Sequence, residues 1–335
     1  MNQGFALYRM PYAREVMLTR GSVREFRSLT ALDCQRGFVV APFAVTADEP
    51  ILLIEPEVEG IESFQVDLPV LALEHQANQR DDYHIDFLNF HAQLLRGTFR
   101  KLVLARSLSI AKADSAAPVE LFQRACNLYP RMFIALVYTP QSGMWLTATP
   151  ETLLSGVDGN WQTMALAGTM PWQDKVAWSD KNLQEQRFVA TYITRLLEQF
   201  SNDFTEEGPY TTRAGHLAHL RSDFRFTLYN NVRVGELLDA LHPTPAVCGL
   251  PKHEAFCFIQ QNEHRTRSYY SGFMGPFNAA ARTHLFVTLR CMQLFSNGYE
   301  LFAGGGLLKD SQEESEWLET ESKLDTMRKV LITEC

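Results

Sequence analysis

The alternation of apolar and polar residues is clearest near the C-terminal end of the chain, where it predicts a hairpin. Residues 284–291 alternate with the period of a strand and place Arg290 on one face. An Asn-Gly pair at 297–298 favours a tight turn, so a return strand is expected over residues 299–303. Three glycines follow at 304–306, where backbone without Cβ atoms can approach a ligand closely. This stretch therefore predicts two strands that end in a glycine turn.

A helix is predicted to follow the glycines, because apolar residues recur there at helical spacing. Ser311 with Glu314 three residues later predicts a capping box at its start. Glu316, Glu319 and Lys323 fall at i, i+3 and i+7 and therefore share one face. Two carboxylates and an ammonium beside a glycine turn suit a divalent cation and a small anion. Acidic residues early in a helix also complement its dipole, so both interpretations stay open at this point.

The part of the chain before this hairpin divides into two regions. Residues 1–76 show short strand patterns and no distinctive polar cluster, so we assign them a structural role. The polar segment 75–83 predicts the boundary between the regions, so the second region is residues 77–335, which carry the candidate chemistry described below.

Two charged residues stand at the ends of apolar strands. Lys101 opens a strand pattern over residues 101–106, where a lysine is most often a solvated strand end. Glu151 follows Pro150 and precedes a Leu-Leu pair, so its carboxyl is expected to be partly buried with a raised pKa. That state suits a general acid near neutral pH, whereas a glutamate in a turn commonly points to solvent.

Two further polar residues fall on apolar faces. Glu185 lies on the apolar stripe of a helix predicted over residues 180–200. A buried carboxylate needs a partner, which is either Lys181, four residues earlier, or a metal ion. His219 lies between apolar residues, where a histidine is most often a hydrogen-bonded core residue.

The composition limits the classes of function. The chain has 335 residues, 46% of them hydrophobic and 21% charged, which is typical of a globular protein with a large core. Its formal net charge of −8 argues against general binding of nucleic acids. No apolar run reaches the ~18 residues of a membrane helix, and the polar N-terminus is unlike a secretory signal. Six cysteines without a C-x-x-C motif indicate reduced thiols, so a cytoplasmic protein is expected.

Eight short segments occur in a distinctive order: KLVLAR (101–106), ATPE (148–151), LAGT (166–169), HPTPAVCG (242–249), RSYYSG (267–272), TLRC (288–291), LFAGGG (301–306) and EWLETESKL (316–324). Together they resemble the chorismate-utilising family of isochorismate, salicylate, anthranilate and aminodeoxychorismate synthases. The resemblance runs from about residue 99 to the C-terminus. It implies an α/β (α+β) fold like that of anthranilate synthase component I, with a large antiparallel β-sandwich flanked by helices. Residues 1–76 would form the N-terminal part of the sandwich and residues 77–335 the chorismate-binding catalytic domain.

The resemblance also implies a site. A Mg²⁺ ion would be held by Glu185 and Glu319, with Glu316 close by. The substrate would contact Gly168, Thr169, His219, Tyr270, Arg290, Gly304, Gly305 and Lys323. Gln186 departs from the pattern, because relatives commonly have histidine there.

Two positions distinguish the branches of the family. The resemblance implies that Lys101 acts as base on a water that attacks the ring carbon beside the carboxylate-bearing one, while Glu151 protonates the departing 4-hydroxyl. Anthranilate synthases carry glutamine at the lysine position, and aminodeoxychorismate synthases carry a nucleophilic lysine where this chain has Ala167. An isochorismate synthase serving menaquinone or siderophore synthesis is therefore expected, as a monomer or homodimer without a glutamine amidotransferase partner. The alternatives are a salicylate synthase, which also releases pyruvate, and a non-catalytic chorismate-binding protein.

Overall fold

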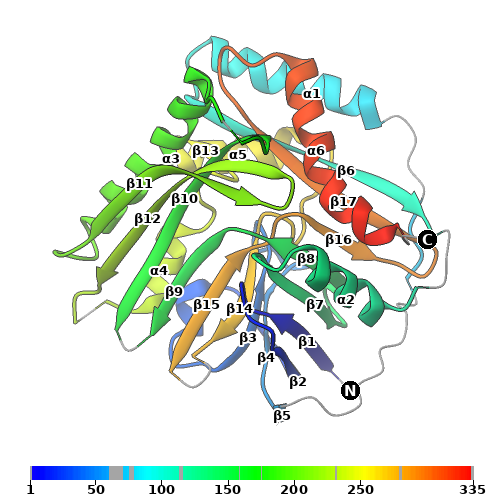
Figure 1. Cartoon of the computed structure of the whole chain (residues 1–335). Coiled ribbons are helices and arrows are strands. Elements are labelled where there is room, and N and C mark those ends of the chain that lie inside the picture. The colour runs from blue at the N-terminus through cyan, green and yellow to red at the C-terminus, as the bar shows by residue number, and fades with distance from the viewer. Residues whose placement is uncertain are drawn as a thin grey trace.

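Two antiparallel β-sheets with helices on their outer sides form the fold of the computed structural model (Figure 1). The structure describes residues 2–59, 71–74, 79–112, 116–157, 159–174, 176–230, 232–278 and 281–332. The predicted boundary between residues 76 and 77 lies outside the described residues. No helix in these ranges is both long and apolar enough to span a membrane.

The order of the strands follows from their pairing. The first sheet runs β13 (Gly249–Leu250), β6 (Lys101–Ala111), β17 (Gly298–Leu307), β16 (Cys291–Leu294), β8 (Gly143–Thr149), β7 (Phe133–Thr139), β1 (Gln3–Arg9), β2 (Val16–Phe26) and β5 (Val58–Glu59). The second runs β11 (Thr205–Ala214), β12 (Leu217–Thr227), β10 (Asn160–Pro171), β9 (Thr152–Val157), β15 (Arg282–Val287), β14 (Phe273–Phe277), β3 (Gly37–Ala41) and β4 (Ile51–Ile54). The end of β2 pairs with β4, so this long strand belongs to both sheets.

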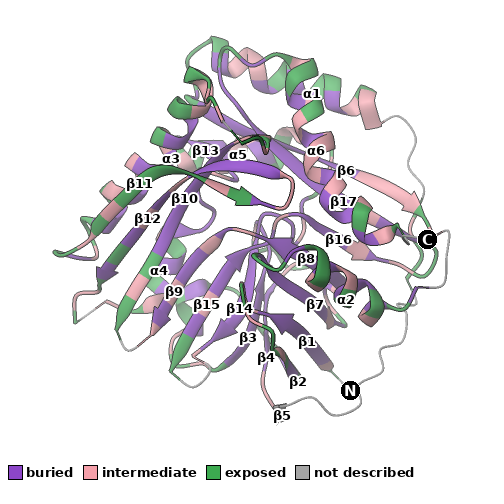
Figure 2. Ribbon diagram, viewed as in Figure 1, coloured by how far each residue is buried: buried purple, intermediate pink, exposed green. Residues whose placement is uncertain are grey.

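The inner faces of the two sheets enclose an aromatic core. Phe133 of β7 stacks on Phe286 of β15 with ring centroids 4.1 Å apart and an interplanar angle of 6°. Tyr8, Phe38 and Trp145 join the same buried cluster. Burial runs along the strands between the helices (Figure 2), as expected when alternate side chains of both sheets point inward.

Helices cover the outer faces. Three further apolar clusters lie under them, formed with α3 (Asp180–Leu197) and α4 (Val234–Leu241), with α2 (Pro118–Leu128) and α6 (Glu313–Leu331), and with α1 (Gln79–Leu95) and α5 (Lys252–Asn262). A short 3₁₀ helix, η1 (Leu29–Leu32), adds to the cluster under α4. The predicted antiparallel sandwich flanked by helices is confirmed.

The C-terminal hairpin differs from its prediction in one informative way. The strand expected over residues 284–291 is two strands, because β15 ends at Val287 in the second sheet and β16 begins at Cys291 in the first. The chain crosses between the sheets at residues 288–290. Arg290 makes this crossing with φ of 46°, a left-handed conformation uncommon for residues with a side chain.

Two smaller expectations for this region are wrong. The three glycines at 304–306 do not form a turn, because β17 continues through them to Leu307 and pairs with β6. Nor does Ser311 form a capping box: its Oγ accepts a hydrogen bond from the Leu308 N–H, and α6 begins at Glu313 with Gln312 as N-cap. The glycines thus act as strand residues without side chains.

Candidate active site

One cavity lies where β10 and β12 of the second sheet face β6 and β17 of the first. It contains about 600 Å³ of space, part of it open to solvent. Nine of the predicted site residues line it: Glu151, Gly168, Thr169, Glu185, His219, Tyr270, Arg290, Gly304 and Lys323. Lys101, Gly305, Glu316 and Glu319 lie next to this lining and contact it or one another, as described below. The structure therefore brings the whole predicted set together.

Lys101 and Glu185 form a buried ion pair at the back of the cavity. Lys101 is 0% exposed, and its Nζ lies 3.0 Å from Glu185 Oε1 at an angle that leaves Nζ without a formed hydrogen bond. Although burial opposes ionisation of Glu185, the nearby lysine ammonium groups lower its pKa overall. Of the two partners considered for Glu185, Lys181 forms its ion pair with Glu316 on another helix instead.

Gly306 makes room for this ion pair. A Cβ atom at Gly306 would lie 2.0 Å from Glu185 Oε1 and 3.0 Å from Lys101 Cε. Any side chain there would displace the carboxylate. The glycine run was expected to allow a close approach to a ligand. At Gly306 the groups that lie close to the β17 backbone are the buried side chains of Glu185 and Lys101.

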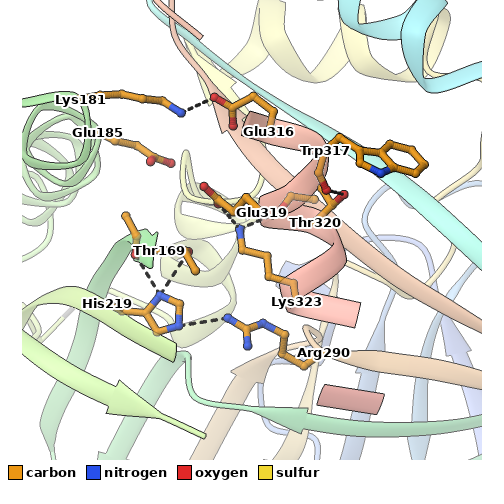
Figure 3. A network of polar contacts seen from close by, with 12 residues as sticks. Thr169, Lys181, Glu185, His219, Arg290, Glu316, Trp317, Glu319, Thr320 and Lys323 are labelled. Carbon is orange, nitrogen blue, oxygen red and sulfur yellow. Dashed lines mark hydrogen bonds and ion pairs between the residues drawn. The ribbon is translucent and has the colours of Figure 1, made fainter. Parts of the chain in front are cut away.

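The predicted shared face of α6 points toward α3 across the cavity (Figure 3). Lys181 of α3 donates to Glu316, and Lys323 donates to Glu319 Oε1 at 2.7 Å and to the Gly304 carbonyl at 2.8 Å. Burial, and then the nearby Glu319 charge, raise the pKa of Glu316. The helix face of two carboxylates and an ammonium therefore meets a third carboxylate, Glu185, from the other side.

The donor set suits a hard divalent cation. Glu316 Oε2 is buried without a hydrogen-bond partner, and a Cβ at Gly305 would lie 3.4 Å from it, so space remains beside the oxygen. Carboxylate oxygens are the ligands that Mg²⁺ prefers. Within the described ranges no three His, Cys, Asp or Glu side chains are already gathered as ligands of one ion. Each of the three carboxylates contacts a lysine instead.

Glu151 is a buried carboxyl at the cavity wall. It is 3% exposed, and burial raises its pKa to about 8 against the opposing effect of Lys101, Lys323 and Arg290. Its position between β8 and β9 explains this, because Pro150 ends the pairing of β8 and turns the next residue inward. At neutral pH the group is mostly protonated and can donate a proton.

His219 and Arg290 form a buried pair that points into the cavity. A β-bulge in β10 at Gly168 turns the Gly168 carbonyl toward His219 Nδ1, at 2.9 Å. Arg290 Nη2 donates to His219 Nε2 at 3.0 Å, so this nitrogen is the acceptor and the ring is neutral. Burial and the neighbouring Arg290 charge lower the pKa of His219 well below its usual value. His219 is thus both a hydrogen-bonded core residue and part of the cavity wall.

The guanidinium of Arg290 keeps its charge in this setting. Burial lowers its pKa to about 10, which leaves it protonated at neutral pH. Its described partners are His219 and the Thr326 hydroxyl at 3.3 Å, neither of which is a carboxylate. The cavity therefore presents a buried cation that is not paired with an acidic side chain.

Sequence reasoning missed some of the lining. Leu166, Val247, Leu289 and Phe302 give the cavity apolar walls. Strand alternation could have indicated Leu166 of β10 and Phe302 of β17, whereas Val247 and Leu289 lie outside the strands. Gln186 does not face the cavity: its Nε2 donates to the Ala165 carbonyl at 3.1 Å and packs α3 against β10.

Comparison with known proteins gives a consistent result. A family model described as chorismate binding enzyme matches residues 61–332. The chain is 30% identical over 268 residues to a salicylate biosynthesis isochorismate synthase of Pseudomonas aeruginosa, covering 76% of this chain and 56% of that protein. It is 30% identical over 258 residues to isochorismate synthase DhbC of Bacillus subtilis, covering 72% and 65%. The matches thus span less than two thirds of either relative.

A solved structure of another isochorismate synthase has a similar fold. The menaquinone-specific isochorismate synthase MenF of Escherichia coli superposes with a TM-score of 0.83 at 21% identity, covering 98% of this chain and 89% of that one. A shared fold follows from this similarity. Because the family model covers most of the chain, this protein belongs to the family of chorismate-binding enzymes.

Proposed function

We propose that the protein is an isomerase that interconverts chorismate and isochorismate with the help of Mg²⁺. The observation that carries this proposal is that a buried carboxyl, Glu151, and a buried lysine, Lys101, lie at one cavity, and burial raises the pKa of Glu151 to about 8. Exchange of one hydroxyl position for another on a ring requires one base and one acid. The named isochorismate synthases among the relatives support the same activity.

The reaction assigns complementary proton transfers to the two groups. Lys101, as the neutral amine left after its own proton has passed to solvent, would take a proton from water as the water oxygen bonds to the ring carbon next to the carboxylate-bearing one. The ring double bonds shift, and the bond to the 4-hydroxyl breaks as Glu151 gives its proton to the departing oxygen. Water is thus consumed and released once each, and the product is an isomer of the substrate. The neutral ring of His219 and the apolar walls would exclude other water from the ring.

The charges of the site suit a dianionic substrate. Glu185, Glu316 and Glu319 each contact a lysine, while Arg290 has no acidic partner among its described contacts. Arg290, Lys323 and the backbone at Gly168, Thr169, Gly304 and Gly305 would hold the substrate's carboxylates. Tyr270 would lie along the ring, since its side chain also lines the cavity.

A divalent ion would be held by Glu185, Glu316 and Glu319. When bound, it would neutralise these carboxylates and polarise the ring carboxylate of the substrate. The three lysines that contact the carboxylates would then be available to the substrate or to water. We further propose that the enzyme is cytoplasmic. It would act without a glutamine amidotransferase, because the proposed nucleophile is water.

The direct test is incubation of the pure protein with chorismate and Mg²⁺, followed by chromatography of the products. Isochorismate is the expected product, and a chelator is expected to abolish turnover until Mg²⁺ is restored. Release of pyruvate would show the salicylate synthase activity instead. Recovery of unchanged chorismate from a protein that binds it would contradict the proposal and indicate a binding protein.

Substitution of Gly306 by alanine tests the buried ion pair. The added Cβ meets the mobile end of the Glu185 side chain, so the carboxylate must move while the fold can adjust. Turnover is expected to fall by about 10²-fold, the scale of a 1 Å misplacement, with little change in Tm.

The matched control is Gly4→Ala at the far end of the sandwich, where the Cβ meets the Tyr138 carbonyl at 2.9 Å. It is expected to lower Tm and leave turnover per folded molecule unchanged. Equal turnover of Gly306→Ala and the unmodified protein would contradict a role for the Glu185 position.

A further inference from the structure

The strand that carries Lys101 has an incomplete neighbour. On one side, β17 pairs with residues 102–111 of β6. On the other side, β13 pairs only with Lys101 and Leu102, and the Val103 N–H then donates to the Cys248 carbonyl at 2.7 Å. Beyond that point no described strand continues the pairing. The Val103 carbonyl and the Ala105 N–H therefore need other partners, because both residues are buried.

A buried ion pair from the end of α5 supplies those partners. Glu263 Oε1 accepts from the Ala105 N–H at 2.7 Å, and Arg267 Nη2 donates to the Val103 carbonyl at 2.7 Å. The two side chains are 2% and 3% exposed and are joined by two hydrogen bonds, at 2.6 and 2.7 Å. A carboxylate and a guanidinium thus present one acceptor and one donor to β6, as a neighbouring strand would.

The same pair also reaches the cavity wall. Arg267 Nη1 donates to the Val247 carbonyl at 2.6 Å, and both Val247 and Val103 line the cavity. Phe43 covers the guanidinium from the other side, with its ring centroid 4.4 Å from Cζ. Arg267 is therefore held by a carboxylate, two carbonyls and an aromatic ring, a fixed geometry that suits its planar fork.

We infer that Glu263 and Arg267 are positioning residues that replace a missing strand beside β6 and so hold Lys101 in place at the cavity. The catalytic consequence rests on the proposed function, whereas the replacement of the strand does not. Neither Glu263 nor Arg267 is among the residues that line the cavity. Their effect acts through the backbone of Val103 and Ala105, two and four residues after Lys101.

The test is Arg267→Lys, which keeps the positive charge but cannot contact Glu263, Val103 and Val247 together. Amide hydrogen exchange of a peptide covering residues 101–106 is expected to become faster. With chorismate as substrate, kcat is expected to fall about 10-fold with KM changed less than about 3-fold, since Lys101 is displaced rather than removed. Glu263→Gln provides a second, milder variant, because its amide oxygen can still accept from Ala105 while the ion pair is lost.

The matched control is Asp86→Asn. Asp86 is also a buried carboxylate, 3% exposed, and it accepts from the N–H of His264 at 3.0 Å, but it has no described hydrogen bond to β6. This variant is expected to lower Tm without changing exchange in residues 101–106 or kcat.

Three outcomes would overturn the inference: unchanged exchange in both Arg267→Lys and Glu263→Gln, the same faster exchange in Asp86→Asn, or faster exchange with unchanged kcat. The exchange measurement keeps its meaning if the unmodified protein does not convert chorismate, so failure of the proposed function and failure of the strand replacement are distinguishable.

Discussion

Replacement of Lys101 by alanine is expected to reduce the conversion of chorismate by about 10²–10⁴-fold, the usual contribution of a positioned base. The reason is geometric: Lys101 is fully buried beside the cavity, so solvent cannot replace its amine. Glu185 loses its described ion-pair partner at the same time. The measurement is steady-state turnover with isochorismate quantified, alongside Tm to confirm that the variant is folded.

Lys309→Ala is the control, because Lys309 is exposed just beyond the end of β17. It is expected to behave like the unmodified protein. If Lys101→Ala retained turnover within about threefold, the assignment of the base would be wrong even though the cavity still bound chorismate.

Replacement of Glu151 by glutamine is expected to remove both the activity and its alkaline limit. The carboxyl acts as an acid only when protonated, and burial raises its pKa to about 8. At pH 7 roughly nine tenths of the molecules therefore carry the proton, and kcat should fall as the pH rises through about 8. Glu151→Gln cannot donate this proton, so a loss of about 10²–10⁴-fold is expected at pH 7.

The shape of the pH profile separates this role from a structural one. Residual activity of Glu151→Gln should no longer decline near pH 8, because the titrating group has been removed. An unchanged alkaline decline in the variant would assign that titration to another group. Retention of full activity at pH 7 would contradict the role of Glu151 as the acid.

The strands and helices were predictable where local periodicity decides them, and less so where the chain changes sheet. Residues 284–291 keep their alternation through the crossing, so the sequence shows one strand where the structure has two. The break occurs at Arg290, whose positive φ is not signalled by a glycine or asparagine. Whether a β residue belongs to one sheet or the other depends on partners far away in the chain.

The candidate site illustrates the same limit at the level of side chains. Helical spacing correctly placed Glu316, Glu319 and Lys323 on one face of α6. It offered Lys181 as one possible partner of Glu185, whereas in the structure Lys181 contacts a carboxylate 135 residues away. Lys101 looked like a solvated strand end, but β13 pairs with it on one side of β6, β17 pairs with β6 from the next residue on the other, and the side chain is buried. The order of the motifs along the chain was enough to indicate the family, but the contact partner of each charged side chain could be known only from the fold.

Because the chain crosses between the sheets at residues 288–290, the position of the Arg290 guanidinium depends on the distance between the two sheets. Arg290 lies between the two sheets, because β15 before it belongs to the second sheet and β16 after it belongs to the first. A core substitution that changes the distance between the sheets, for example at the stacked Phe133 and Phe286, is expected to shift this guanidinium. The residues that line the cavity would be unchanged. Substitutions that stabilise the aromatic core are therefore expected to alter the proposed activity through this crossing, whereas redesign of the outer helical faces does not act through it.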